Sequence, residues 1–205
     1  VPSSTSSISD DAFSGSSLAS VKVNSNNANY SSDTNGVLFN KNKTTLIRYP
    51  LNSSISSYTV PNTVKTIGGK AFDSSRNLKS LTVGSAVTSI GSGAFSECTE
   101  LAKITVAEGN KDYSSDGFGT LFNADKTTLI KYPSANTAKT YVVPSTVTTI
   151  GKEAFCNADK LTNIGIGLGV SNISERAFYD CSSVEVILIP DNVKKIGASP
   201  FDSCT

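Results

Sequence analysis

The sequence predicts a solenoid of tandem repeats that is mostly β-structure, with parallel strands stacked from one coil to the next. Two observations support this prediction: equivalent apolar residues recur at a step of about 23 residues, and the copies share a stretch of the type Leu-x-x-Ile-x-Val, with other aliphatic residues at its apolar positions in some copies. A unit this short cannot bury its own apolar side chains, so neighbouring copies must supply the other half of the core. Self-similarity at a fixed step is therefore the strongest signal in the chain.

The step is clearest at a recurring Phe. Phe72 and Phe95 are one step apart, and the same step leads from Phe155 to Phe178 and on to Phe201. Because this Phe and the apolar positions around it repeat together, we expect them to point inward and close a flattened coil.

Each copy contains one strand and a short return. In Leu101-x-x-Ile104-x-Val106, Ile104 and Val106 are two positions apart and so share one face of a strand. Stacked copies then form a parallel sheet on the concave side. The return, Val-x-x-Ile-Gly-x-x-Ala-Phe, is too short for a long helix, so it predicts short helical or 3₁₀ turns.

Two 37-residue insertions interrupt the step, at about 24–60 and 107–143, and they match each other position by position at a constant offset. Each reads as strand, polar turn and strand; in the first insertion Asn40-Lys41-Asn42-Lys43 forms the turn. This pattern predicts two protruding β-hairpins. Residues 1–205 would then form a single repeat array.

Composition narrows the function classes. Apolar residues make up 38% of the chain, and 18 Lys+Arg against 17 Asp+Glu give a net charge of +1, unlike a typical nucleic-acid binder. No apolar run reaches the length of a membrane span. His is absent, which removes the commonest general base and metal ligand. We expect no enzyme, no cofactor, no metal, no nucleic-acid partner and no membrane insertion in this segment.

The residues with reactive or ligating groups have structural explanations. Cys98, Cys181 and Cys204 share one repeat position, where we expect a buried thiol that meets a backbone group, although a Cys181–Cys204 disulfide is conceivable. Cys156 is out of register and has no assigned role. Asp33, Asp112 and Asp116 favour turns over a calcium site, because no full set of oxygen ligands appears in the sequence.

Candidate binding residues occupy positions that the repeat leaves exposed. Val186 and Leu188 are apolar at strand positions where solvent is expected, which is typical of a contact surface. The concave-face candidates are Lys22, Lys79, Thr82, Lys103, Thr105, Asn163, Glu185, Val186 and Leu188. The hairpins are an equally supported alternative for the binding site. Their candidate residues are Lys41, Lys43, Arg48, Tyr49, Lys126, Lys131 and Tyr132.

The full pattern, Ile-Gly-x-x-Ala-Phe-x-x-Cys-x-x-Leu-x-x-Ile-x-Val at residues 90–106, resembles the BspA-like leucine-rich repeats of bacterial surface proteins. A second match lies at 173–190, and the hairpin phrase at 36–50 is also similar to that family. The resemblance covers nearly the whole chain. It implies a leucine-rich-repeat solenoid in an exported or surface-anchored protein that binds other macromolecules, typically host matrix proteins or other cells.

We therefore predict a non-enzymatic protein-binding module of a secreted or surface-anchored bacterial protein, acting in adhesion, with extracellular or host-surface proteins as partners. The alternative is a structural spacer that displays another domain. The chain contains no Met, and its first residues lack the basic and apolar regions of a signal peptide. We expect a segment of a longer protein whose signal and anchor lie outside it.

Overall fold

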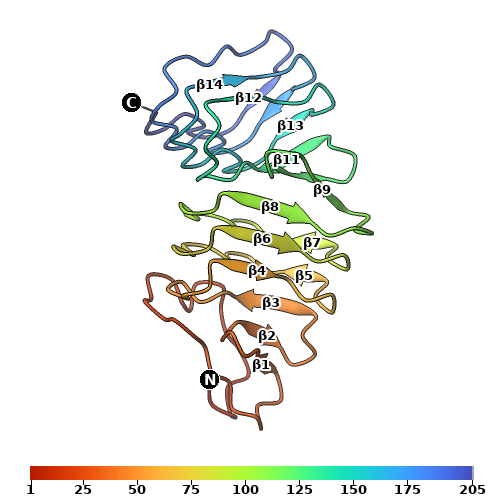
Figure 1. Cartoon of the computed structure of the whole chain (residues 1–205), viewed down its shortest axis with the longest axis vertical. Coiled ribbons are helices and arrows are strands. Elements are labelled where there is room, and N and C mark those ends of the chain that lie inside the picture. Colours follow the sequence, from red (N-terminus) through yellow and green to blue (C-terminus); the bar gives the residue numbers. More distant parts are fainter. Residues whose placement is uncertain (205) are drawn as a thin grey trace. The chain divides into compact units, whose positions relative to one another are not determined.

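A computed structural model describes residues 1–204 as a β-solenoid, in which short strands and turns wind into successive coils (Figure 1). Two compact units divide the chain. Unit 1 comprises Val1–Glu100 and Ala107–Asn110, and unit 2 comprises Leu101–Val106 and the chain from Lys111 on. The strands of unit 2 repeat those of unit 1 at the offset that relates the two insertions. That both units belong to one array stays a prediction.

In unit 1, one sheet has the strand order β1-β2-β3-β5-β7, and a separate parallel ladder joins β4 to β6. The first three strands are antiparallel, and the later strands of the sheet pair in parallel at the repeat step, so that Thr66 faces Ser89. The strands are β1 (Tyr30–Ser32), β2 (Leu38–Asn40), β3 (Thr45–Arg48), β4 (Ser57–Thr59), β5 (Thr66–Ile67), β6 (Ser80–Val83) and β7 (Ser89–Ile90).

Unit 2 has the same plan with one more parallel strand. Its sheet has the order β16-β15-β13-β11-β10-β9, and β12 pairs with β14. In β8, the Ile104 N–H donates to the Gly119 carbonyl. The strands are β8 (Lys103–Val106), β9 (Tyr113–Ser115), β10 (Leu121–Asn123), β11 (Thr128–Lys131), β12 (Thr140–Val142), β13 (Thr149–Ile150), β14 (Asn163–Gly165), β15 (Asn172–Ile173) and β16 (Lys195–Ile196).

Parallel strands at the repeat step are confirmed, but the return segments differ from the prediction. Residues 1–204 contain no helix or 3₁₀ turn; the Val-x-x-Ile stretch forms a second parallel ladder, and Ala-Phe lies in a turn. The reason is backbone handedness. Lys70, Glu153 and Arg176, each directly before the Ala, have φ of 54°, 55° and 51°, which a right-handed helix cannot accommodate.

The two predicted strand pairs form, but the expectation that they protrude is wrong. β2 pairs antiparallel with β3, and β10 with β11, each around a short polar turn. Leu38, Phe39 and Leu46 are fully buried, so the hairpin belongs to the sheet and its core. In each turn a Lys with a left-handed backbone, Lys43 or Lys126, places its amine 5.9 Å from the ring centroid of a buried Phe.

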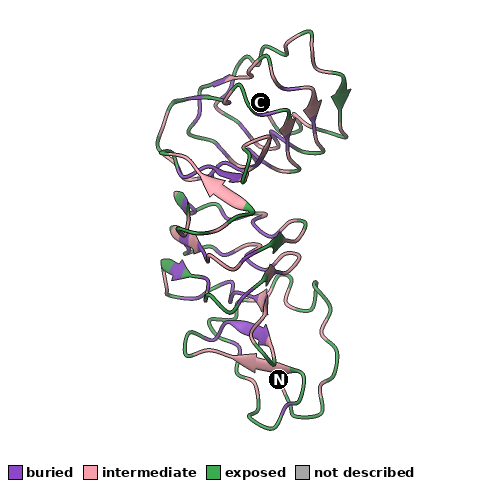
Figure 2. Ribbon diagram, turned by 90° about the vertical axis from the view of Figure 1, so that its right-hand side faces the viewer, coloured by how far each residue is buried: buried purple, intermediate pink, exposed green. Residues whose placement is uncertain are grey.

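An aromatic stack runs through the interior of each unit. Figure 2 colours the buried residues of the coils purple. The repeat step lays each ring on its counterpart in the next coil, with centroids 5.2–5.9 Å apart. Such pairs contribute about 0.5–1.5 kcal/mol each beyond the area they bury. The stacks are Tyr49, Phe72 and Phe95 in unit 1, and Tyr132, Phe155, Phe178 and Phe201 in unit 2.

Candidate functional site

The outward-facing residues of β4 and β6 in unit 1, and of β12, β14 and the segment 185–189 in unit 2, form what we call the motif-strand faces. Alternation along each strand sends every second side chain into the core and the others outward. In unit 1 the outward residues are all hydroxylic, and the Ser80 hydroxyl lies 2.8 Å from that of Ser57. These residues are Ser57, Thr59, Ser80 and Thr82.

The motif-strand face of unit 2 is more apolar. Val142 on β12 is 66% exposed, and it faces Gly165 of β14. In the next coil, Val186 and Leu188 are 67% and 79% exposed, while Ile187 between them packs against the core. Leu168, just after β14, is 82% exposed. Val142 thus stands where unit 1 has Thr59, and Val186 and Leu188 stand where β8 has Lys103 and Thr105.

The same face of unit 2 has an unpaired sheet edge. Among residues 1–204, β14 pairs only with β12, and residues 185–189, one repeat step later, form no strand. β14 therefore has a strand partner on one side only. The exposed aliphatic side chains of this face suit contact with another polypeptide.

The remaining concave-face candidates do not form one basic stripe within a unit. Lys22 and Lys79 belong to unit 1, whereas Lys103 belongs to unit 2. Lys22, Lys79, Lys103, Thr105, Asn163 and Glu185 are exposed, and Thr82 is half-buried.

Four of the hairpin candidates lie in the interior and are not available to a partner in the folded chain. These are Arg48, Tyr49, Lys131 and Tyr132. Strand alternation sends Arg48 and Lys131 inward, and the two Tyr rings start the aromatic stacks. Of the others, Lys41 is exposed, and Lys43 and Lys126 are half-buried.

The two inward cations have different partners. The Arg48 guanidinium lies 3.7 Å from the Asp73 carboxylate and donates to the carbonyls of Lys70 and Asp73. Burial raises the pKa of Asp73 and lowers that of Arg48, and their mutual attraction opposes both shifts. These groups stabilise the turn in the interior, where neither is accessible to a ligand.

The Lys131 amine in unit 2 donates instead to the carbonyls of Glu153 and Cys156, at 3.3 and 3.1 Å. Cys156 stands at the position of Asp73, shifted by the offset that relates the two insertions. That offset was readable from the sequence and accounts for the one Cys outside the repeat register.

Two Asp–Tyr pairs repeat at the same offset. The Tyr58 hydroxyl donates to Asp33 at 3.0 Å, and that of Tyr141 donates to Asp116 at 2.8 Å. The other carboxylate oxygen of each Asp accepts backbone N–H groups of its own loop. These contacts confirm the turn interpretation for Asp33 and Asp116. Among the described residues, no group of His, Cys, Asp or Glu side chains could hold a metal.

The repeated cysteines form a ladder of thiols. Cys98, Cys181 and Cys204 donate to the carbonyls of Phe72, Phe155 and Phe178, at 3.0–3.2 Å. Burial raises the pKa of Cys181 to about 12, so its thiol stays protonated and unreactive at neutral pH. No disulfide joins the four cysteines within residues 1–204. The predicted bond to a neighbouring backbone group is therefore confirmed.

Comparisons with known proteins agree with this architecture. The family model for the BspA type leucine rich repeat region matches in six copies, over residues 1–53, 49–137 and 132–205. A comparison with curated protein sequences finds no match. No helix in residues 1–204 has the length and apolar character to cross a membrane.

Solved structures of bacterial proteins are similar in fold. A leucine-rich repeat protein from Eubacterium ventriosum is 25% identical, with a TM-score of 0.52 over 87% of this chain and 68% of that one. The pneumococcal vaccine antigen PcpA is 26% identical, with a TM-score of 0.57 over 71% of this chain and 48% of that one. A leucine rich cell surface protein from Faecalibacterium prausnitzii, 24% identical with a TM-score of 0.55, shares the fold over 92% of this chain and 50% of that one. The chain thus spans about half the length of the latter two proteins.

The family model covers the whole sequence, and the stacked strands, thiols and aromatic rings recur at its repeat step. This chain belongs to the BspA-type leucine-rich-repeat family.

Proposed function

We propose that this chain is a non-enzymatic protein-binding module of a secreted or surface-anchored bacterial protein, acting in adhesion to matrix or to other cells. Membership of a leucine-rich-repeat family supports a binding scaffold. Two similar structures are described as a vaccine antigen and as a cell surface protein, which supports an extracellular location.

The observation that carries the proposal is the apolar motif-strand face of unit 2. Val142 stands where unit 1 has Thr59 in a strand with the same backbone pairing, and Val186 and Leu188 stand where β8 has Lys103 and Thr105, so the coil itself does not require aliphatic residues at these positions. Exposed Val142, Val186 and Leu188 are therefore best explained by a partner that covers them.

Burial by a partner gives these side chains a substantial contribution to affinity. Removing one Val or Leu side chain from water contributes about 1.5–3 kcal/mol, and each 1.4 kcal/mol is about tenfold in Kd. A carboxylate at the same position would instead have to be desolvated without a partner. Replacing two of these residues by Asp should therefore abolish detectable binding.

Surface plasmon resonance tests the proposal with immobilised fibronectin, laminin and type I collagen. The wild-type chain should bind at least one of them saturably. The double variant Val142→Asp/Leu188→Asp should lose this binding, whereas Thr59→Asp/Thr82→Asp, with the same added charge on the unit 1 face, should keep it. Equal loss in both variants would contradict a site on unit 2. No binding to any of the three would favour a spacer role.

A further inference from the structure

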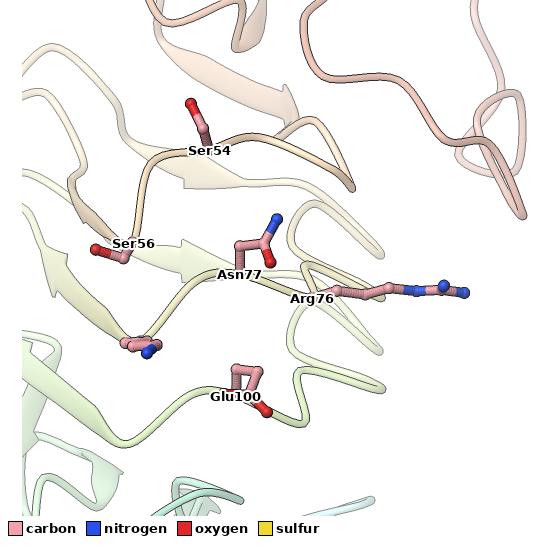
Figure 3. Close-up of a pocket in the computed structure, with 6 residues that line it drawn as sticks. Ser54, Ser56, Arg76, Asn77 and Glu100 are labelled. Carbon is pink, nitrogen blue, oxygen red and sulfur yellow. The ribbon is translucent and has the colours of Figure 1, made fainter.

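A polar hollow on unit 1 lies beside the loops that lead into β4 and β6. Its volume is about 600 Å³, within the usual range of small-molecule sites. Figure 3 shows Ser54 and Ser56 on one loop, Arg76 and Asn77 on the next, and Glu100 on a third, with the Arg76 side chain extending away from the other labelled residues. The lining residues are Ser54, Ser56, Arg76, Asn77, Lys79 and Glu100.

The hollow has an excess of positive charge that the protein leaves unmatched. Within residues 1–204, neither Arg76 nor Lys79 forms an ion pair, and Glu100 forms none either. A free guanidinium presents a planar pair of N–H donors that matches a carboxylate. Two cations against one carboxylate favour a ligand with a single negative charge.

The other lining groups suit hydroxyls. The Asn77 side-chain amide donates to the Ser53 carbonyl at 3.0 Å, which leaves its oxygen to accept. Ser54 and Ser56 supply hydroxyls that both donate and accept, and Glu100 accepts only. A sugar ring presents hydroxyls that satisfy all of these groups. Sulfate has no hydroxyl to donate to Glu100, and phosphate has too few to satisfy the whole set.

Backbone bonds between coils hold these groups in place before any ligand arrives. The Arg76 N–H donates to the Leu51 carbonyl at 3.2 Å, and the Lys79 N–H donates to the Ser56 carbonyl at 2.7 Å. Only side-chain rotations remain to be ordered, so little conformational entropy is lost on binding.

The fold does not demand this set of charges, because unit 2 does not repeat it. Where unit 1 has Arg76, unit 2 has Asp159, which pairs with the neighbouring Lys160 at 3.3 Å. The residues of unit 2 at the corresponding positions are Thr137, Lys139, Asp159, Lys160, Thr162 and Ser183.

We propose that the hollow binds an acidic sugar residue of a glycan, a sialic or uronic acid. Arg76 takes the sugar carboxylate at the rim of the hollow, Lys79 adds positive charge to the lining, and Ser54, Ser56, Asn77 and Glu100 take hydroxyls of the sugar. The site lies on unit 1, apart from the protein-binding face proposed on unit 2, so either proposal can fail without the other.

Isothermal titration calorimetry of the full chain in 150 mM NaCl tests the proposal. The probes are 3′-sialyllactose, a hyaluronan tetrasaccharide with uronic acids, neutral lactose, and tetraglutamate. One of the two acidic sugars should bind saturably, lactose should not, and tetraglutamate should bind more weakly. Arg76→Gln should lower the affinity for the acidic sugar at least tenfold. Lys139→Gln, which removes an exposed charge from unit 2, should leave that affinity unchanged.

Three results would overturn the proposal. Binding of neither acidic sugar would exclude the ligand class, and stronger binding of tetraglutamate would favour an acidic peptide. Equal weakening by Arg76→Gln and Lys139→Gln would mean unspecific charge attraction. Because Arg76 is exposed, thermal melts of both variants should match the wild type and show that the fold is intact.

Discussion

Units 1 and 2 have nearly the same order and pairing of strands, but they differ in the side chains at several equivalent positions. Both stack aromatic rings, hold an Asp–Tyr pair and turn through a left-handed residue before an Ala-Phe pair, at Lys70 in unit 1 and Glu153 in unit 2. They differ in the buried cation, the bonding of one Tyr hydroxyl and the polarity of the exposed strand face. The shared features are therefore what the coil requires, and the differences are where each unit is free to specialise.

Removing a buried aromatic side chain from the middle of a stack should have the largest effect on stability. Phe155 lies between the rings of Tyr132 and Phe178, so Phe155→Ala should destabilise the protein by about 3–5 kcal/mol. Phe201 is only partly buried and stacks on one ring, so Phe201→Ala should cost clearly less. Urea unfolding measures both; equal costs would refute the stack as the main source of stability.

Replacing the buried Arg48–Asp73 pair by the residues of unit 2 should have the second-largest effect on stability. Asp73→Cys places the residue of unit 2 beside Arg48 and leaves the guanidinium without its carboxylate, at a cost of about 3 kcal/mol. Adding Arg48→Lys reproduces the arrangement of Lys131 and Cys156 and should recover part of that loss. A double-mutant cycle by urea unfolding checks this, and strictly additive effects would contradict a coupled pair.

Two equivalent tyrosines should respond in opposite directions. The Tyr49 hydroxyl donates to the Ile55 carbonyl at 2.8 Å, so Tyr49→Phe should destabilise by about 1 kcal/mol. The buried Tyr132 hydroxyl has no partner within residues 1–204, so Tyr132→Phe should leave stability unchanged or raise it. Thermal unfolding distinguishes the two, and a destabilised Tyr132→Phe would show that its hydroxyl is bonded.

A rise to alkaline pH should have the smallest effect on stability of the changes considered. Burial raises the pKa of Tyr132 to about 12, so above pH 10 the unfolded chain loses this proton while the folded chain keeps it. Stability therefore falls as pH rises, by about 0.8 kcal/mol for this group at pH 10.5. Tyr132→Phe should lose that much less between pH 8 and 10.5. An identical loss in both proteins would mean that Tyr132 titrates normally.

The repeat step predicted the parallel strands, the stacked Phe and the Cys ladder, because these depend only on what recurs. It missed the left-handed turns, since Lys70 and Glu153 are not residues that usually mark such a conformation. Sequence reasoning also predicted that Arg48 and Tyr49 are exposed at the surface. Charge and a hydroxyl suggest exposure, yet strand alternation and the stack send both inward. Val186 and Leu188 were identified because apolar residues stood at outward positions.

Hydrogen–deuterium exchange in complex with the matrix protein that binds most tightly tests the proposed function most directly. Protection should appear in β12, β14 and residues 185–189 of unit 2, which carry Val142, Val186 and Leu188. The corresponding strands β4 and β6 of unit 1 should exchange as in the free chain. Saturable binding with protection confined to unit 1, or with none on either motif-strand face, would contradict the proposal.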